Sequence, residues 1–240
     1  MIGIIGFGRF GKLTARYLAE DFEVYVFNRT DRSAEIKKAG ARNASLKTVC
    51  QQKIVILCVP ISTLKEILVE IGPLLKKGAV VVDVCSVKVY PVRWMQAALP
   101  ETVSILATHP IFGPDSAANS LKGHKIFMSP IRIDRKHYQK VKTYLASKEL
   151  VLIESTPEDH DEQIAVSLAL THYIGRSLSA FGAAPLGIDS EGYKRLLHIL
   201  EVVENDTWQL FHDMHHYNPY AQEKRAAFMQ AMQKIDDQLD

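Results

Sequence analysis

The stretch "GIIGFGRFGKLTARYL", residues 3–18, decides the fold of the first half of the chain. Its apolar start predicts a buried strand, and Gly6-x-Gly8-x-x-Gly11 then opens an amphipathic helix. Gly6 would allow the tight turn, Gly8 would let the backbone approach a pyrophosphate, and Gly11 would let helix and strand pack closely. The helix N-terminus then faces the phosphates. We expect the cofactor contacts of this dinucleotide-binding turn to be Gly6, Phe7, Gly8, Arg9, Phe10 and Gly11.

Short apolar runs alternate with amphipathic stretches through the first 155 residues. Most of these runs lack a strict alternation of polar and apolar residues, which is typical of strands buried on both faces of a parallel sheet. We expect strands at 2–5, 24–27, 54–59, 80–84, 105–108, 126–129 and 151–154. The alternation predicts an α/β domain at residues 1–155, with a Rossmann-like, doubly wound and mostly parallel sheet.

The pattern changes near Thr156. "TPEDHDEQ" starts a helix, with Thr156 as N-cap, Pro157 at the first helical position and acids in the first turn. No strand pattern follows, so residues 156–240 are predicted to form an all-helical domain. The helix predicted for residues 164–182 is apolar on most sides, so it needs a partner, either the first domain or another subunit.

The composition is that of a globular protein, with 47% apolar residues, 23% charged residues and a formal net charge of +2. No basic stripe indicates nucleic acid, and no apolar run reaches the ~18 residues of a membrane span. We expect no signal peptide, because the first residues already form the strand pattern. Cys50, Cys58 and Cys85 form no C-x-x-C pair, so we expect reduced thiols in a cytoplasmic protein that binds neither nucleic acid nor membranes.

The second predicted strand runs into "VYVFNRTDRS", residues 24–33. An NAD enzyme usually places an acid at this strand end to bind the ribose 2′-hydroxyl. This chain has Asn28, Arg29 and Thr30 instead, and a guanidinium suits a 2′-phosphate. The sequence therefore favours NADP over NAD, although Asp31 lies close enough to serve as the acid.

Three further strand ends are expected to meet at the nicotinamide, because open α/β sheets bind ligands at the carboxyl ends of their strands. The first supplies cofactor contacts from Cys58, Val59 and Pro60, the last two forming an apolar wall. The second, "VVVDVCSVK", supplies Ser86 and Lys88, and the third ends at His109. The "PIFGP" loop that follows would aim this histidine into the crevice. A serine and a histidine beside a nicotinamide predict a reacting centre.

Five stretches together resemble the prephenate/arogenate dehydrogenases of tyrosine biosynthesis. They are "GFGRFG" at 6–11, "DVCSVK" at 83–88, "THPIFGPDSA" at 108–117, "EDHDEQIAVSLALTH" at 158–172, with Asp159 as an extra residue, and "NDTWQLFHDMHHYNPYA" at 205–221. The resemblance implies a fold like that of 6-phosphogluconate dehydrogenase, with a homodimer formed through the helical domain. It also implies an oxidative decarboxylation. Hydride leaves C4 of a cyclohexadienol for the nicotinamide, the 4-hydroxyl loses its proton, and CO2 departs as the ring becomes aromatic.

The resemblance also implies roles for single residues. His109 would be the base that takes the hydroxyl proton, a role that suits neutral histidine, and Ser86 would hydrogen-bond the histidine and the reacting hydroxyl. Lys88, counted with the substrate-binding residues, would either assist electrostatically or hold the loop. In the helical domain, His172 matches a family histidine that faces the substrate, with Thr171 beside it.

Asp206, in "ENDTWQLF", matches an acid with which one arogenate-preferring subgroup pairs the substrate ammonium. A neutral amide there goes with prephenate. The resemblance therefore favours arogenate, with prephenate as the alternative, while Asp206 is also placed to cap the helix that follows. Many relatives use an arginine of the helical domain for a substrate carboxylate. The corresponding stretch, "HHYNPYAQ", has none, and Arg225 comes later.

Two other functions stay open. A β-hydroxyacid or imine oxidoreductase would share the fold, but several of those enzymes use a lysine in the helical domain, and the pair of Ser86 and His109 argues against them. A nucleotide-sensing module without catalysis would keep the glycines and need neither of these residues. The histidines of "FHDMHHYN", residues 211–218, have the spacing of metal ligands, but the implied chemistry needs no Lewis acid, so we expect no metal.

Overall fold

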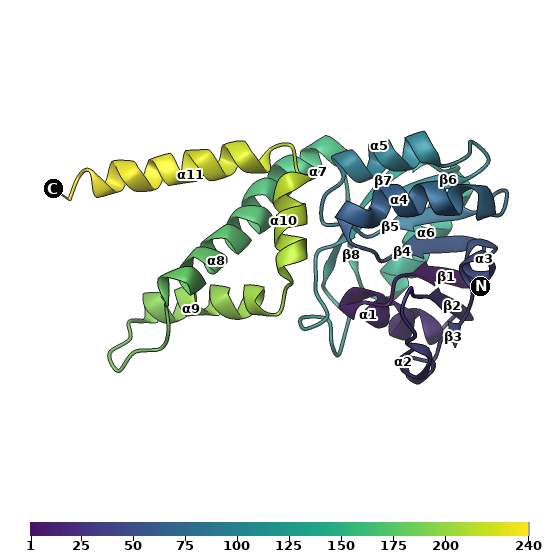
Figure 1. Ribbon diagram of the computed structural model, residues 1–240, viewed down its shortest axis with the longest axis horizontal. Coiled ribbons are helices and arrows are strands. Elements are labelled where there is room, and N and C mark those ends of the chain that lie inside the picture. Colours follow the sequence, from purple (N-terminus) through teal and green to yellow (C-terminus); the bar gives the residue numbers. More distant parts are fainter. Residues whose placement is uncertain (240) are drawn as a thin grey trace. The chain divides into compact units, whose positions relative to one another are not determined.

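The computed structural model describes residues 1–239, which divide into two compact units (Figure 1). The first unit runs from Met1 to Pro157, and the second begins at Glu158. The sequence predicts this boundary between residues 155 and 156. The first unit contains a sheet with helices, and the second, green to yellow in Figure 1, contains helices.

Eight strands form one sheet in the first unit, in the order β3-β2-β1-β4-β5-β6-β7-β8. Their bounds are β1 Ile2–Ile5, β2 Val24–Phe27, β3 Arg42–Asn43, β4 Ile54–Leu57, β5 Val80–Asp83, β6 Ser104–Pro110, β7 Lys125–Arg132 and β8 Val151–Glu154. Neighbouring strands pair in parallel, except β6 and β7, which are antiparallel. The predicted mostly parallel, Rossmann-like sheet is therefore confirmed.

Helices cover both faces of this sheet. Their bounds are α1 Arg9–Ala19, α2 Ser33–Lys38, α3 Leu46–Cys50, α4 Ile61–Ile71, α5 Val89–Ala98 and α6 Arg135–Ser147, with a 3-10 turn at Gly72–Leu74. Side chains of α1 and α6 line one apolar cavity with Ile56, Val82 and Leu106 of the sheet, so these two helices share a face. All four residues of β1 and of β5 are buried, which explains why their sequences are apolar without alternation.

The strand β6 continues further than its sequence predicts. The prediction ends this strand at Thr108, but the structure pairs both His109 and Pro110 with β7. Proline has no N–H to donate to a partner strand. The N–H of the next residue, Ile111, donates to β7, and successive N–H groups of a strand point to opposite sides. The N–H that Pro110 lacks would therefore point away from β7. On that side β5 has already ended at Asp83, and no ladder bond is lost. His109 therefore lies within a paired strand and not at the start of a loop.

The second unit is helical throughout the part that the structure describes. Its elements are α7 Pro157–Ile164, a π-helical segment η2 Ala165–Leu170, α8 Thr171–Phe181, α9 Glu191–Glu204, α10 Trp208–His216 and α11 Ala221–Asp236. A Cβ on Gly175 of α8 would lie 2.8 Å from Cγ2 of Val203 on α9, so these two helices pack closely. In the described part of the chain, no helix combines the length and the apolar character needed to cross a membrane.

The cap of α10 differs from the prediction. Thr207 is the N-cap residue, and its hydroxyl oxygen accepts a hydrogen bond from the N–H of Leu210 at 3.1 Å. The predicted capping role of Asp206 is therefore wrong, because a threonine one residue later supplies the acceptor at the N-cap position. The Asp206 carboxylate is consequently available for other contacts.

Candidate active site

Packing within the protein requires two of the three glycines in the first turn. Gly6 has φ +96°, and a Cβ there would lie 2.2 Å from the carbonyl oxygen of Cys58. A Cβ on Gly11 would lie 2.3 Å from the carbonyl oxygen of Gly6. At Gly8 φ is −71°, and no described protein atom beyond its own chain neighbours lies within 4 Å of a Cβ. The space at Gly8 fits a ligand that approaches the N-terminus of α1.

Gly8→Ala should therefore separate ligand binding from folding. We expect this variant to keep the unfolding midpoint of the wild type, because the added methyl group meets no described protein atom outside its chain neighbours. Its dinucleotide affinity, measured by calorimetry, should fall about tenfold or more, because the methyl group takes space that a phosphate needs. Gly11→Ala is the control, and it should lower the unfolding midpoint. A wild-type dissociation constant in Gly8→Ala would contradict the assignment.

The residues that follow β2 support the glycine turn. Asn28 accepts a hydrogen bond from the N–H of Phe7 at 2.9 Å and donates to the carbonyl oxygen of Thr30 at 3.0 Å. The side chain of Phe7 is buried in the core, although the sequence places it among the cofactor contacts. Phe7 and Asn28 thus hold the turn from inside, while Arg29 and Thr30 are exposed.

Asp31, the alternative ribose-binding acid, is engaged by the start of α2. Its carboxylate accepts hydrogen bonds from the N–H of Ser33 at 2.9 Å and from the hydroxyl of the same residue. These bonds from Ser33 lower the pKa of Asp31. Arg29 is an exposed residue after β2 that offers a charge complementary to a phosphate, whereas the exposed Arg32 is bonded to Glu35 at 2.8 Å.

The loop that follows β6 is attached to α1. Nη2 of Arg9 lies 2.6 and 2.7 Å from the two carboxylate oxygens of Asp115. The hydroxyl of Tyr17 donates to a backbone carbonyl of the same loop at 2.9 Å. The rings of Phe10 and Phe112 lie 6.2 Å apart between centroids. These contacts join segments far apart in the sequence, and no pattern within either segment predicts them.

The end of β4 lies behind the glycine turn. The N–H of Cys58 donates to the carbonyl oxygen of Ile5 at 2.8 Å. Burial raises the pKa of the Cys58 thiol to about 12, so the thiol stays neutral. Val59 packs toward Gly6, and Pro60 is exposed at the start of α4. Of the three predicted cofactor contacts, Cys58 and Val59 are half-buried beside the glycine turn, and Pro60 is exposed to solvent.

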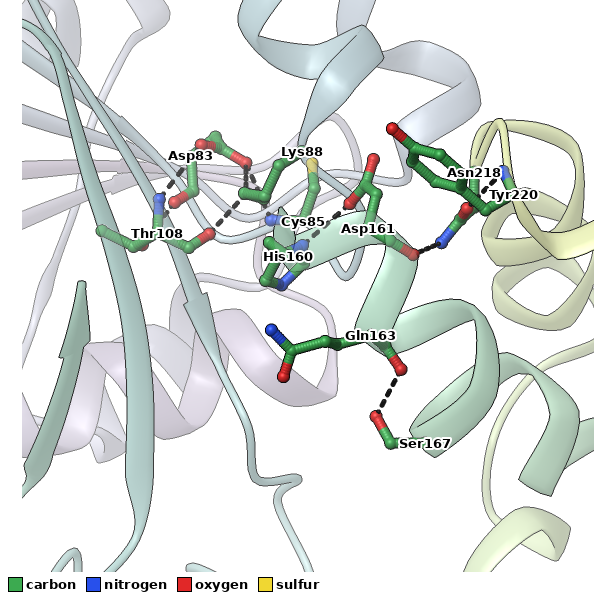
Figure 2. A network of polar contacts seen from close by, with 10 residues as sticks. All are labelled: Asp83, Cys85, Lys88, Thr108, His160, Asp161, Gln163, Ser167, Asn218 and Tyr220. Atoms are coloured by element: carbon green, nitrogen blue, oxygen red, sulfur yellow. Dashed lines mark hydrogen bonds and ion pairs between the residues drawn. The ribbon is translucent and has the colours of Figure 1, made fainter. Parts of the chain in front are cut away.

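A buried polar network joins the ends of β5 and β6 (Figure 2). The ammonium of Lys88 is paired with the carboxylate of Asp83 and donates to the carbonyl oxygen of Thr108. The hydroxyl of Thr108 donates to the carbonyl oxygen of Asp83 at 2.5 Å, and the N–H of Cys85 donates to the Asp83 carboxylate at 3.1 Å. The side chains of Asp83 and Lys88 have no exposed surface, so Lys88 fits its predicted loop-holding role.

The predicted catalytic residues come from neighbouring strand ends. Ser86 follows β5, and its hydroxyl oxygen is buried with no hydrogen-bond partner among the described residues. His109 lies on β6, which pairs with β5, and 6% of its surface is exposed. A buried hydroxyl without a partner is unfavourable, so this hydroxyl fits a position where a bound group or an ordered water completes its hydrogen bonding. The first unit thus carries a serine hydroxyl and a buried histidine near neighbouring strand ends, at the edge where α/β sheets bind ligands.

In the second unit, the structure brings His172 and Asp206 together. Nε2 of His172 lies 3.7 Å from Oδ2 of Asp206, and Nδ1 is buried with no partner among the described residues. Burial lowers the pKa of His172, which favours the neutral imidazole. Arg176 donates to the backbone carbonyl of Asp206 and lies 4.5 Å from the ring centroid of Trp208. Thr171 is half-buried, and its hydroxyl donates to a backbone carbonyl one turn earlier.

A second cluster in this unit surrounds His215 and is not predicted from the sequence. Nη1 of Arg225 lies 3.1 Å from Nδ1 of His215, and its guanidinium carbon lies 5.8 Å from the ring centroid of Tyr173. Burial, with the Arg225 guanidinium beside it, lowers the pKa of His215 to about 4. The turn between α10 and α11 brings these residues together. Within residues 1–239, no group of three or more His, Cys, Asp or Glu side chains is arranged to hold a metal ion.

Comparisons with known proteins cover both units. Residues 15–154 match the family described as "Prephenate dehydrogenase, nucleotide-binding domain", and residues 177–240 match "TYRAAT1-like, C-terminal domain". The chain is 30% identical over 248 residues to arogenate dehydrogenase 1, chloroplastic, of Arabidopsis thaliana. This alignment covers 99% of the chain and 39% of the plant protein, so the chain spans well under half the length of that relative.

Two solved structures show the same fold. Prephenate dehydrogenase from A. aeolicus, in complex with hydroxyphenyl propionate and NAD+, has a TM-score of 0.80 at 21% identity, covering 99% of this chain and 90% of that one. Synechocystis arogenate dehydrogenase has a TM-score of 0.72 at 20% identity, covering 99% of this chain and 92% of that one. At these identities the likeness shows the fold alone.

Proposed function

Because this chain belongs to the prephenate/arogenate dehydrogenase family, we propose that it catalyses the NADP-dependent oxidative decarboxylation of arogenate to tyrosine. Prephenate, which would give 4-hydroxyphenylpyruvate, is the alternative substrate. One observation supports the proposal most directly. The buried Ser86 hydroxyl, without a partner among the described residues, follows the strand that pairs with the strand of His109.

The glycine turn supports a nicotinamide dinucleotide as the cofactor. The open space at Gly8 and the N-terminus of α1 fit a pyrophosphate, and the A. aeolicus neighbour was solved with NAD+. The exposed Arg29 supports NADP, because a guanidinium pairs well with a 2′-phosphate. Asp31 is engaged by Ser33, which weakens the case for NAD. When bound, the nicotinamide would supply the hydride acceptor.

We assign the proton transfers to His109. Oxidation at C4 of the substrate needs a base for the hydroxyl proton, and a neutral imidazole suits this role. The Ser86 hydroxyl would hydrogen-bond the reacting oxygen and hold it toward the imidazole. As the C4 oxygen becomes a carbonyl, the bond between the ring and its carboxylate breaks and CO2 leaves. The bonding electrons flow into the ring ketone to give a phenolate, and the imidazolium of His109 returns the proton.

The surroundings of Asp206 support arogenate as the substrate. The side chain of Asp206 is 30% exposed and lies beside His172, so its carboxylate has an open side on which to pair with an ammonium group. Prephenate has a keto group in place of this ammonium and offers the carboxylate no cation. For the side-chain carboxylate of the substrate we propose Arg225, which is half-buried between His215 and Tyr173.

Asp206→Asn should move the substrate preference from arogenate toward prephenate. The amide keeps the size of the side chain but removes the charge that pairs with the ammonium, so the ratio of the two kcat/KM values should change about tenfold. The measurement is the initial rate of NADPH and NADH formation with both substrates and both dinucleotides. Glu204→Gln is the control, because it removes an exposed carboxylate from the same segment.

The two failures of this experiment have different meanings. An unchanged ratio in Asp206→Asn would show that Asp206 does not recognise the ammonium, and would leave the reaction itself untouched. A wild-type protein that turns over neither substrate with either dinucleotide would overturn the proposed function.

We also propose a homodimer formed through the helical unit. The structure describes 14 large hydrophobic side chains as exposed, and ten of them belong to this unit. These ten are Val166, Phe181, Leu186, Ile188, Leu196, Trp208, Met229, Met232, Ile235 and Leu239. These exposed side chains are compatible with a second copy of the chain, which is the partner that the family suggests for this unit.

A further inference from the structure

We propose that the buried ion pair of Asp83 and Lys88 positions Ser86 and His109 for the reaction. Lys88 is then a positioning residue and not a substrate ligand. This inference rests on the proposed function, because it concerns the same two strand ends. Its basis is that one ammonium group is bonded both to the strand end before Ser86 and to the peptide bond before His109 (Figure 2).

The ion pair closes the loop that holds Ser86. Asp83 is the last residue of β5, and Lys88 is the N-cap residue of α5. The carboxylate of Asp83 also accepts the N–H of Cys85 at 3.1 Å, directly before Ser86. The backbone is therefore held on both sides of Ser86, which fixes the position from which its side chain projects.

The same ammonium fixes the backbone in front of His109. The last ladder pair between β5 and β6 joins Asp83 to Ala107, so regular pairing stops two residues before this histidine. Lys88 then donates to the carbonyl oxygen of Thr108, which belongs to the peptide bond joining Thr108 to His109. The Thr108 hydroxyl and N–H reach the carbonyl and Oδ1 of Asp83 at 2.5 and 3.3 Å. This network therefore continues the connection between the two strands beyond their ladder.

The complete burial of the ion pair indicates that the pair serves to fix the positions of neighbouring groups. Both side chains have no exposed surface, and removing two charges from water is unfavourable unless good geometry compensates. Apolar residues of similar volume often stabilise a core equally well, so stability alone does not call for an ion pair here. Hydrogen bonds set distances and directions more strictly than apolar packing does. A centre that needs a hydroxyl and an imidazole at fixed positions would use this restriction.

Two variants test the proposal, and Lys88→Met should have a larger effect on kcat than Thr108→Val. The first removes the ammonium and keeps an unbranched apolar chain, and the second removes only the hydroxyl that reaches Asp83. We expect kcat to fall about 10²-fold in Lys88→Met and about tenfold in Thr108→Val, because misplacement of reacting groups lowers the rate of the chemical step. The KM for arogenate and the dissociation constant of NADP should stay at wild-type values. The control is Leu68→Ala on α4, a buried position that should lower the unfolding midpoint and leave kcat unchanged.

Each outcome decides the matter. Wild-type kcat in a folded Lys88→Met would overturn the positioning role and leave the proposed function standing. A raised KM with unchanged kcat would also overturn it, in favour of direct substrate binding by Lys88. If Lys88→Met does not fold, Thr108→Val decides, and wild-type kcat in that variant overturns the role. A wild-type protein inactive on arogenate and on prephenate overturns the proposed function and this role together.

Discussion

His109→Ala should lower kcat by about 10³-fold and leave the dissociation constant of NADP unchanged. The imidazole is the proposed base for the 4-hydroxyl proton, and alanine offers no group that accepts a proton. The proposed dinucleotide contacts lie at the ends of other strands, in the glycine turn after β1 and in the loop after β2. The measurements are steady-state NADPH formation with arogenate and calorimetric titration with NADP.

Two controls separate loss of the base from general damage. His137→Ala removes an exposed imidazole from α6 and should turn over at the wild-type rate. Imidazole added to the buffer should restore part of the rate of His109→Ala, because the truncated side chain leaves room for it. Wild-type turnover by His109→Ala would refute the assignment of the base.

The parts of the fold that were predicted from the sequence depend on local patterns. Continuous apolar runs predict strands buried on both faces, and β1 and β5 are buried along their whole length. Gly6 and Gly11 are recognisable because they belong to one short motif with fixed spacing, although the atom that crowds Gly6 comes from Cys58, directly after β4. Patterns of this kind are decided by residues near one another in the chain.

The errors and omissions arise where distant residues decide the outcome. Pro110 reads as a strand end in the sequence, but the antiparallel partner β7 and the early end of β5 make it acceptable within β6. Arg225 meets His215 across the turn between α10 and α11. The turn itself has a local signal in Asn218-Pro219, but the direction that α11 takes after it has none.

In the candidate site, too, some features follow from local sequence patterns and others depend on residues distant in the chain. The strand ends that carry Ser86 and His109 follow from the order of apolar runs, whereas their roles rest on the resemblance to a family. Lys88 illustrates what only the structure adds. The sequence leaves two roles open for it, and its buried pairing with Asp83 and its bond to Thr108 favour the loop-holding one.

Arg29→Glu should weaken NADP binding about 10²-fold and leave NAD binding unchanged. The guanidinium is exposed after β2, where the adenosine ribose of a dinucleotide lies in this type of fold. A glutamate removes the cation that would pair with the 2′-phosphate and places a like charge beside it. The measurement is the pair of dissociation constants for NADP and NAD, with kcat/KM for both as a second readout.

Arg32→Ala is the control for Arg29→Glu, because it removes a cation from the same loop. The guanidinium of Arg32 is already bonded to Glu35 at 2.8 Å, so its loss should change the affinity for neither dinucleotide. Equal weakening of NADP and NAD by Arg29→Glu would mean that Arg29 stacks on the adenine, which both dinucleotides share, and does not recognise the phosphate. A wild-type preference for NAD would instead return the role of ribose recognition to Asp31, which would have to exchange its bonds to Ser33 for the 2′-hydroxyl.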